Sequence, residues 1–110
     1  MSFNILSIPP FDKQLKRLAK KYPSLKKEFA DLLEKLEQQP EQGTKLGNNC
    51  YKIRMSIASK GKGKSGGARV ITNFVINENT VFLIAIYDKS EKDNLTNLEL
   101  YELLKFVSPS

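Results

Sequence analysis

Residues 50–76, CYKIRMSIASKGKGKSGGARVITNFVI, predict two neighbouring β-strands joined by a basic, glycine-rich connection. In the first strand, the apolar residues Tyr51, Ile53 and Met55 alternate with Lys52 and Arg54. A period of two places these groups on opposite faces, so one face of the strand is apolar and the other is cationic. The segment ARVITNFVI predicts the second strand. Together the two strands indicate a mostly antiparallel sheet in the second half of the chain.

Helices are predicted before this stretch. Apolar residues recur at helical spacing in 11–22 and again in 25–36, and a very short segment at Pro23-Ser24 joins the two patterns. This arrangement predicts an antiparallel helical hairpin. Residues 4–8 predict a short strand that ends at Pro9-Pro10.

A further strand and a helix are predicted after the stretch. Residues 80–88, TVFLIAIYD, are apolar on both faces, which favours a place in the centre of the sheet. Asn77-Glu78-Asn79 predicts the turn before this strand, because Asn tolerates positive φ. The capping box Thr96-Asn97-Leu98-Glu99 predicts the start of a final helix.

The element order β-α-α-β-β-β-α predicts an α+β fold. We expect one domain over residues 1–110, with an N-terminal helical hairpin packed on a mostly antiparallel four-stranded sheet and a C-terminal helix. The single Cys50, the lack of a secretory signal and the lack of an apolar run of about 20 residues favour a cytoplasmic protein without a membrane span. Since the chain has no His, the commonest general base and metal ligand is missing, and no cofactor or metal site is predicted.

The net charge of +6 is concentrated in one part of the chain. No acidic residue occurs from Gln42 to Asn77. The basic residues of this segment are Lys45, Lys52, Arg54, Lys60, Lys62, Lys64 and Arg69. Such a stretch is typical of a surface that binds a polyanion. The alternative is a solvated loop, and acidic lipid is a weaker candidate because no amphipathic helix accompanies the charge.

Residues 58–65, ASKGKGKS, also fit the relaxed pattern of a nucleotide-binding loop. Such a loop needs a helix directly after it, so that the helix N-terminus meets the phosphates. A strand is predicted here instead, and nucleotide hydrolysis is therefore disfavoured.

Tyr87 and Lys89 share a face of the last strand, and an aromatic ring among cations suits RNA, because cations hold phosphates and the ring stacks on an unpaired base.

The sequence resembles a known family. CYKIRMSIASKGKGKSGGARVI, followed by IAIYDKSEKDNLT and a closing helix, is similar to the RelE/ParE superfamily of bacterial toxins, in particular to HigB/RelE-type toxins with a GKGKxGGxR hairpin. The resemblance implies the toxin of a type II toxin–antitoxin system, an endoribonuclease that cleaves mRNA in the ribosomal A site without a metal. It also implies an antitoxin partner, HigA- or RelB-like and encoded by the adjacent gene, with one toxin monomer inside a hetero-oligomer.

The resemblance also suggests site residues. Lys52, Arg54 and Arg69 match positions that bind phosphate and stabilise the transition state, and Tyr87 and Lys89 fall in the C-terminal catalytic strand. Some HigB-type members use His in this site, and this chain has none. The other basic residues of the acid-free segment are assigned to RNA and ribosome binding. They are Lys45, Lys60, Lys62 and Lys64.

The chemistry is feasible without His. The 2′-hydroxyl attacks the adjacent phosphorus in line and leaves a 2′,3′-cyclic phosphate and a 5′-hydroxyl. The increase in rate comes from positioning and from cations near the developing charge. Lys52 is the candidate proton acceptor, because nearby Arg54 and Arg69 make its neutral amine less costly. Two other functions stay open: a ParE-like inhibitor of DNA gyrase, and an RNA- or ribosome-binding protein with a degenerate active site.

Overall fold

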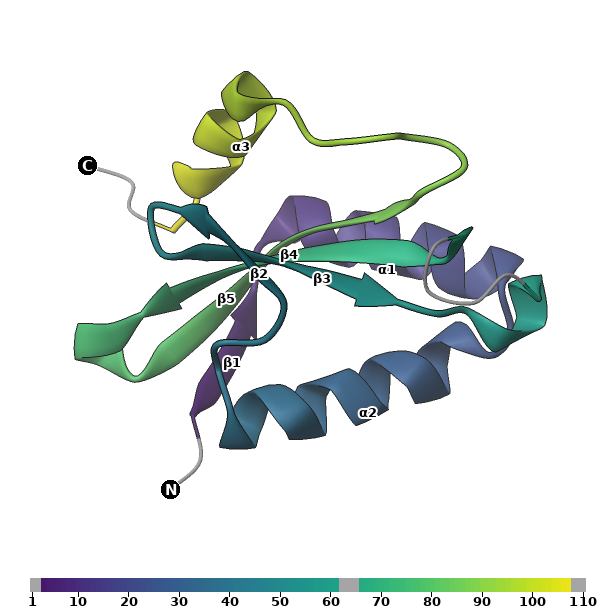
Figure 1. Ribbon diagram of the computed structural model, residues 1–110, viewed down its shortest axis with the longest axis horizontal. Coiled ribbons are helices and arrows are strands. Elements are labelled where there is room, and N and C mark those ends of the chain that lie inside the picture. The colour runs from purple at the N-terminus through teal and green to yellow at the C-terminus, as the bar shows by residue number, and fades with distance from the viewer. Residues whose placement is uncertain (1–2, 62–65, 108–110) are drawn as a thin grey trace.

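The computed structural model describes residues 3–61 and 66–107 of the 110-residue chain. The helices are α1 (Pro9–Lys21), α2 (Leu25–Gln38) and α3 (Asn97–Leu104), and two short 3-10 turns, η1 (Ala58–Lys60) and η3 (Ile76–Glu78), flank β4. The strands are β1 (Asn4–Ser7), β2 (Thr44–Gly47), β3 (Cys50–Met55), β4 (Ala68–Val75) and β5 (Thr80–Asp88). Figure 1 shows α2 on one side of the sheet and α3, with the loop that precedes it, on the other side.

The strands form one mixed sheet, which in the described part of the chain has five strands in the order β1-β5-β4-β3-β2. Three pairings are antiparallel, as predicted, and β1 runs parallel to β5. The prediction of four strands was wrong because β2 was missed. Its four residues, TKLG, are all exposed and carry no apolar alternation, so they give no strand signal of their own.

The apolar run of β5 had suggested that β5 is the central strand. The central strand is β4, and β5 lies beside it. β4 is buried along nearly its whole length, although it contains Arg69, Thr72 and Asn73. Because β4 has a neighbouring strand on each side, its position in the sheet does not depend on how apolar its own sequence is. The apolar sequence of β5 therefore predicted correctly that β5 is an inner strand, but it did not predict the order of the strands in the sheet.

The predicted helical hairpin is present. Pro9 and Pro10 occupy the first helical positions of α1, where a missing N–H costs nothing, so they begin the helix as well as end the strand. α1 packs chiefly against β5, and its Phe11 ring lies 5.7 Å from the Phe29 ring of α2, measured between centroids. Leu18, Leu25 and Leu36 are completely buried. Burial of each contributes about 1.5–3 kcal/mol relative to exposure.

Two positions at the ends of the inner strands depend on special backbone geometry. Asn79 adopts φ 57° and closes the connection between β4 and β5, as the Asn-rich turn predicted. Gly67 directly precedes β4 and lies close against the end of β3, because a Cβ there would stand 2.2 Å from the carbonyl oxygen of Met55. Only glycine fits this position without a backbone shift.

The capping box of α3 is confirmed. The Thr96 hydroxyl accepts the N–H of Glu99, and the Glu99 carboxylate accepts the N–H of Thr96. Hydrogen bonds from Lys92 and then from Thr96 lower the pKa of Glu99 to about 2. α3 has no fully buried residue, so its N-terminal cap and its partly buried leucines hold it on the sheet.

Candidate nucleic-acid interface

One row of side chains crosses three strands of the sheet. In the strand register, Arg54 of β3 lies opposite Arg69 of β4, and Arg69 lies opposite Tyr87 of β5. Directly opposed residues point to the same face, so these three residues, separated in sequence by up to 33 positions, project together. Lys52 is two residues before Arg54 on β3 and shares this face.

The row places two arginine residues directly opposite each other on neighbouring strands. Like charges facing each other across a strand pair destabilise a sheet, so this arrangement has an energetic cost. An anion between the two groups would remove that cost, and the planar guanidinium suits a phosphate because it can donate two parallel hydrogen bonds. The row is therefore electrostatically suited to a phosphodiester.

Arg69 and Tyr87 are buried, whereas Arg54 is exposed and Lys52 is half-exposed. Arg69 Nη1 donates a 3.2 Å hydrogen bond to the carbonyl oxygen of Ala68, which fixes its guanidinium on the strand. The relative exposure of Tyr87 is only 6%, so its ring offers no open face on which a base could stack in this conformation. The stacking platform expected from the sequence is thus covered in this conformation, and the loop after β5 brings the Leu95 backbone near the Tyr87 hydroxyl.

Tyr87 nevertheless has a polar role available. Its hydroxyl is buried. Among the described residues it makes no well-formed hydrogen bond, although the Leu95 backbone lies near it. Burial raises the pKa of Tyr87 despite the opposing effect of Arg69. A protonated phenol beside Arg69 can donate a hydrogen bond to an anion.

Lys89 lies directly after β5, and its N–H donates to the carbonyl oxygen of Gly67, which extends the pairing with β4. Its ammonium group binds the Asp93 carboxylate at 2.6 Å. The hydrogen bond from Lys89, together with the charges of Lys89, Lys52 and Arg69, lowers the pKa of Asp93. Asp93 is thus an acid at the border of the basic face. Sequence reasoning missed it, because residues 89–93 are not helical and the pairing depends on how this loop folds.

Of the four predicted RNA-binding lysines the structure describes two, Lys45 and Lys60, and neither is part of the row. Lys45 of β2 pairs with Tyr51, whose side chain alternates to the face opposite Lys52, so Lys45 lies away from the row. Lys60 binds the buried carboxylate of Asp88, and its side chain is only 10% exposed. Lys62 and Lys64 lie outside the described residues.

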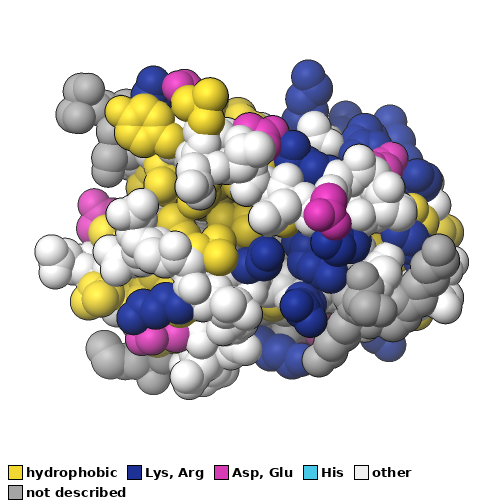
Figure 2. All heavy atoms as spheres, turned by 45° about the horizontal axis from the view of Figure 1, so that its top comes forward, with side chains coloured by type: hydrophobic (Ala, Val, Ile, Leu, Met, Phe, Trp, Pro, Cys, Tyr) yellow, Lys and Arg dark blue, Asp and Glu magenta, His cyan; other side chains and the backbone are white. Residues whose placement is uncertain are grey.

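The face that carries α3 combines charge with apolar surface. Figure 2 shows Lys and Arg side chains gathered near its middle, acidic side chains among them, and hydrophobic side chains grouped to the left. In residues 3–61 and 66–107, no group of three carboxylate, thiol or imidazole side chains is placed to hold a metal ion. None of the helices in these ranges is long and apolar enough to cross a membrane.

The chain is similar to known proteins in sequence and in fold. Residues 11–108 match the family described as the RelE toxin of the RelE/RelB toxin–antitoxin system. A free-state E. coli RelE toxin with two arginine-to-alanine substitutions has a similar fold, with a TM-score of 0.63 and 17% identity over 99% of this chain and 98% of that one. The intact E. coli RelBE toxin–antitoxin complex gives a TM-score of 0.62 and 17% identity over 79% of this chain and 96% of that one. Because the family match extends over nearly the whole sequence, this protein belongs to the RelE toxin family of toxin–antitoxin systems.

Proposed function

We propose that this protein is a ribosome-dependent endoribonuclease that cleaves mRNA in the A site and thereby inhibits translation. The observation that carries the proposal is the row of Arg54, Arg69 and Tyr87 with Lys52 beside it. These groups come from three strands and project to one face of the sheet. Such an arrangement suits the binding of a phosphate whose charge increases during the reaction.

The proposed reaction is an in-line attack of the 2′-hydroxyl on the neighbouring phosphorus. The 2′-oxygen loses its proton and forms a bond to phosphorus, while the bond between phosphorus and the 5′-oxygen breaks. The products are a 2′,3′-cyclic phosphate and a 5′-hydroxyl, whose oxygen takes up a proton. Arg54 and Arg69 would stabilise the charge on the phosphate oxygens, and the Tyr87 hydroxyl would donate to one of them.

Lys52 remains the proposed proton acceptor, since it lies on the same face as Arg54 and is half-exposed. Asp93 is less suited to that role. A carboxylate whose pKa is lowered holds a proton weakly, and Asp93 is engaged by Lys89. We assign Lys89 to binding the RNA backbone, where it would exchange Asp93 for a phosphate.

The proposal includes partners. The family name and the RelBE complex support an antitoxin that binds and silences this chain, RelB- or HigA-like and encoded by the neighbouring gene. We expect one toxin monomer in a hetero-oligomer located in the cytoplasm, with the ribosome and its mRNA as targets. The antitoxin would act by barring entry to the ribosome, because covering several cations directly is costly unless each one is paired.

The test is a translation extract programmed with one mRNA. Cuts within the A-site codon would support the proposal, and Arg69→Ala should reduce the cleavage rate at least about tenfold, which corresponds to roughly 1.4 kcal/mol of transition-state stabilisation. Ribosome stalling without cuts would favour a binding protein with a degenerate site. Inhibition of gyrase supercoiling without cuts would favour the ParE-like alternative. Efficient cleavage of naked RNA would contradict the dependence on the ribosome.

A further inference from the structure

Asp88, the last residue of β5, is completely buried and accepts hydrogen bonds from three other residues. The Tyr22 hydroxyl donates to Oδ2, and the ammonium group of Lys60 donates to Oδ1. Ser90 donates to Oδ1 with its backbone N–H at 2.9 Å and with its hydroxyl at 2.8 Å. Lys60 also donates to the Ser90 hydroxyl at 2.9 Å and lies 5.8 Å from the centre of the Tyr22 ring.

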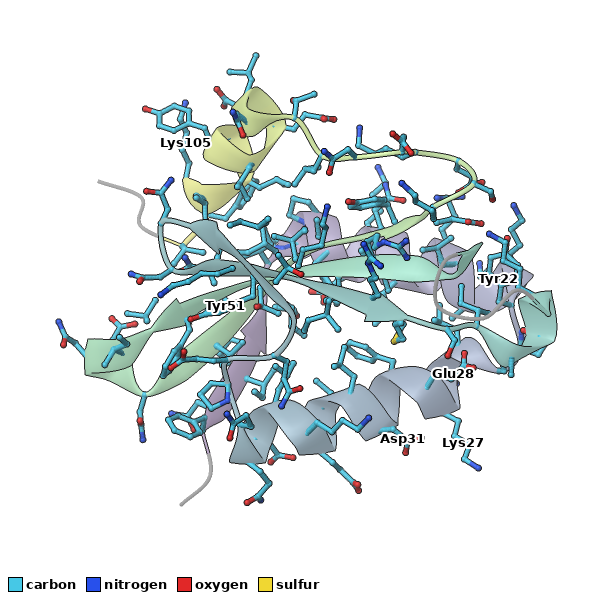
Figure 3. The ribbon with its side chains drawn as sticks, in the orientation of Figure 1. Tyr22, Lys27, Glu28, Asp31, Tyr51 and Lys105 are labelled. Atoms are coloured by element: carbon cyan, nitrogen blue, oxygen red, sulfur yellow. The ribbon has the colours of Figure 1, made fainter. Side chains whose placement is uncertain are left out.

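These residues join three parts of the fold that are distant in sequence. Tyr22 caps the C-terminus of α1, and Lys60 is the last residue of η1, which follows β3 after two residues. Asp88 ends β5, and Ser90 is two residues further on. In Figure 3 the labelled Tyr22, after the end of α1, and Glu28, near the start of α2, lie at the same end of the molecule. We call the group Tyr22, Lys60, Asp88 and Ser90 the Asp88 cluster.

A second set of contacts holds η1 against the same turn. The Glu28 carboxylate accepts the N–H of Ala58 at 2.6 Å, and the Ser24 hydroxyl accepts the N–H of Ser59 at 2.9 Å. The outgoing end of β3 is therefore fixed at successive residues, of which Lys60 is the last. Residues 58–60 are therefore held by specific contacts, unlike the residues of a loop that only exposes basic side chains to solvent.

The Asp88 cluster lies directly behind the proposed site. Asp88 is between Tyr87 and Lys89 in the chain, and strand alternation turns its side chain to the opposite face. Ala68 faces Asp88 across the sheet and immediately precedes Arg69 on β4. A side chain held by several donors restricts the backbone torsions at its own position and hence the directions in which its two neighbours project.

From this geometry we infer that Asp88, Lys60 and Tyr22 are positioning residues, which lock the ends of β3 and β5 so that Tyr87 and Lys89 are held beside Arg54 and Arg69. This assignment replaces the RNA-docking role that the sequence suggested for Lys60. A lysine whose ammonium group already binds a buried carboxylate is poorly placed to bind phosphate. The inference rests on the proposed nuclease function for its kinetic test.

The kinetic test compares Lys60→Met, Asp88→Asn and the double variant in single-turnover cleavage on programmed ribosomes. Thermal unfolding of each variant fixes an assay temperature at which all of them are folded. Each single variant should lower the saturated rate about tenfold, while the ribosome concentration at half saturation changes less than about twofold. The double variant should lose no more than either single variant, because one interaction is removed in all three. Lys60→Arg, which keeps the charge, should recover part of the rate.

Two results would overturn the inference. One is a folded Asp88→Asn protein with the saturated rate of the wild type. The other is a Lys60→Met protein with a raised half-saturation concentration and a flatter salt dependence, and with Asp88→Asn unchanged in both, since that pattern marks a phosphate contact. If the larger changes prevent folding, Tyr22→Phe removes a single hydroxyl and should lower the saturated rate about two- to threefold. An unchanged rate in that variant would count against the inference.

Hydrogen exchange separates this inference from the proposed function. The Lys89 amide donates to the carbonyl oxygen of Gly67 at 3.0 Å, so its protection reports whether the end of β5 is locked. In Asp88→Asn this amide should exchange at least about tenfold faster, while amides within α2 keep their protection. If the wild type cuts nothing on ribosomes but the Lys89 amide loses protection, the nuclease proposal fails and the locking of the strand end stands. Unchanged exchange would contradict the locking itself.

Discussion

Arg54 on β3 faces Arg69 on β4, and we predict that Arg54→Gln stabilises the fold while it slows cleavage. Favourable cross-strand pairs contribute about 0.2–1 kcal/mol, and like charges directly opposite each other are destabilising, which we take to be of similar size. Because Arg54 is exposed, solvent and salt screen it, and the relief should be roughly 0.2–0.5 kcal/mol. Since 1 kcal/mol moves the melting temperature of a domain of this size by roughly 3–6 °C, the expected rise is about 1–3 °C. Glutamine keeps much of the side-chain length, so packing changes little.

The same substitution should cost activity. A hydrogen bond from a charged donor is worth about 1.5–3 kcal/mol, and its loss in the transition state lowers the rate roughly 10- to 100-fold. Gain of stability with loss of rate is the pattern expected of a residue retained for function at a cost in stability. A residue retained only for structure would show the opposite pattern.

The assay pairs scanning calorimetry with single-turnover cleavage on ribosomes. Calorimetry at low and high salt provides an internal check, because the Debye length falls from about 10 Å at 0.1 M to about 3 Å at 1 M and the stability gain should shrink accordingly. Lys45→Gln is the control for stability, since Lys45 is an exposed cation on β2 that faces Tyr51 and no second cation. A lower melting temperature in Arg54→Gln combined with wild-type cleavage would refute the reasoning.

Three further predictions concern residues around the row. Gly67→Ala should destabilise the protein by about 1–3 kcal/mol in urea unfolding, because its Cβ would stand 2.2 Å from the carbonyl oxygen of Met55 and the ends of β3 and β4 would have to separate. Asp93→Asn should tighten ribosome binding by about twofold at low salt, because it removes an acid that binds Lys89 near the proposed phosphate site. Burial acts to raise the pKa of Asp88, but hydrogen bonds from Lys60, Tyr22 and Ser90 outweigh it and lower the pKa. The stability due to this carboxylate is therefore full above pH ~4 and is lost as pH falls further, so Asp88→Asn should flatten the acid limb of a plot of unfolding free energy against pH.

Matched changes control these three experiments. Gly47→Ala tests a glycine with φ 94° and open space around it, so it should show only the cost of its backbone conformation and not that of a clash. Glu102→Gln removes an exposed acid paired with Lys105 on α3 and should leave ribosome binding unchanged. In the acid titration, Asp12→Asn tests a carboxylate outside the Asp88 cluster. Equal slopes for Asp12→Asn and Asp88→Asn would count against the role given to Asp88.

Much of the fold could be predicted because its signals are local. The 3.6-residue period gave α1 and α2, and the capping box at Thr96 gave the start of α3. The period of two placed Lys52 and Arg54 on one face of β3 before any partner strand was known. β2 gave no such signal, since a short exposed strand is defined by its neighbour and not by its own composition.

The sequence by itself determined which side chains share a face of a helix or strand, because that depends only on backbone geometry over a few residues. The tertiary structure decided which strands are neighbours, and hence that Arg54, Arg69 and Tyr87 form one row. It also decided that Lys60 binds Asp88, a partner 28 residues away, instead of facing solvent like other lysines. Such pairings depend on how distant segments pack, and a charged side chain carries the same local pattern whether it meets water, an ion partner or a ligand.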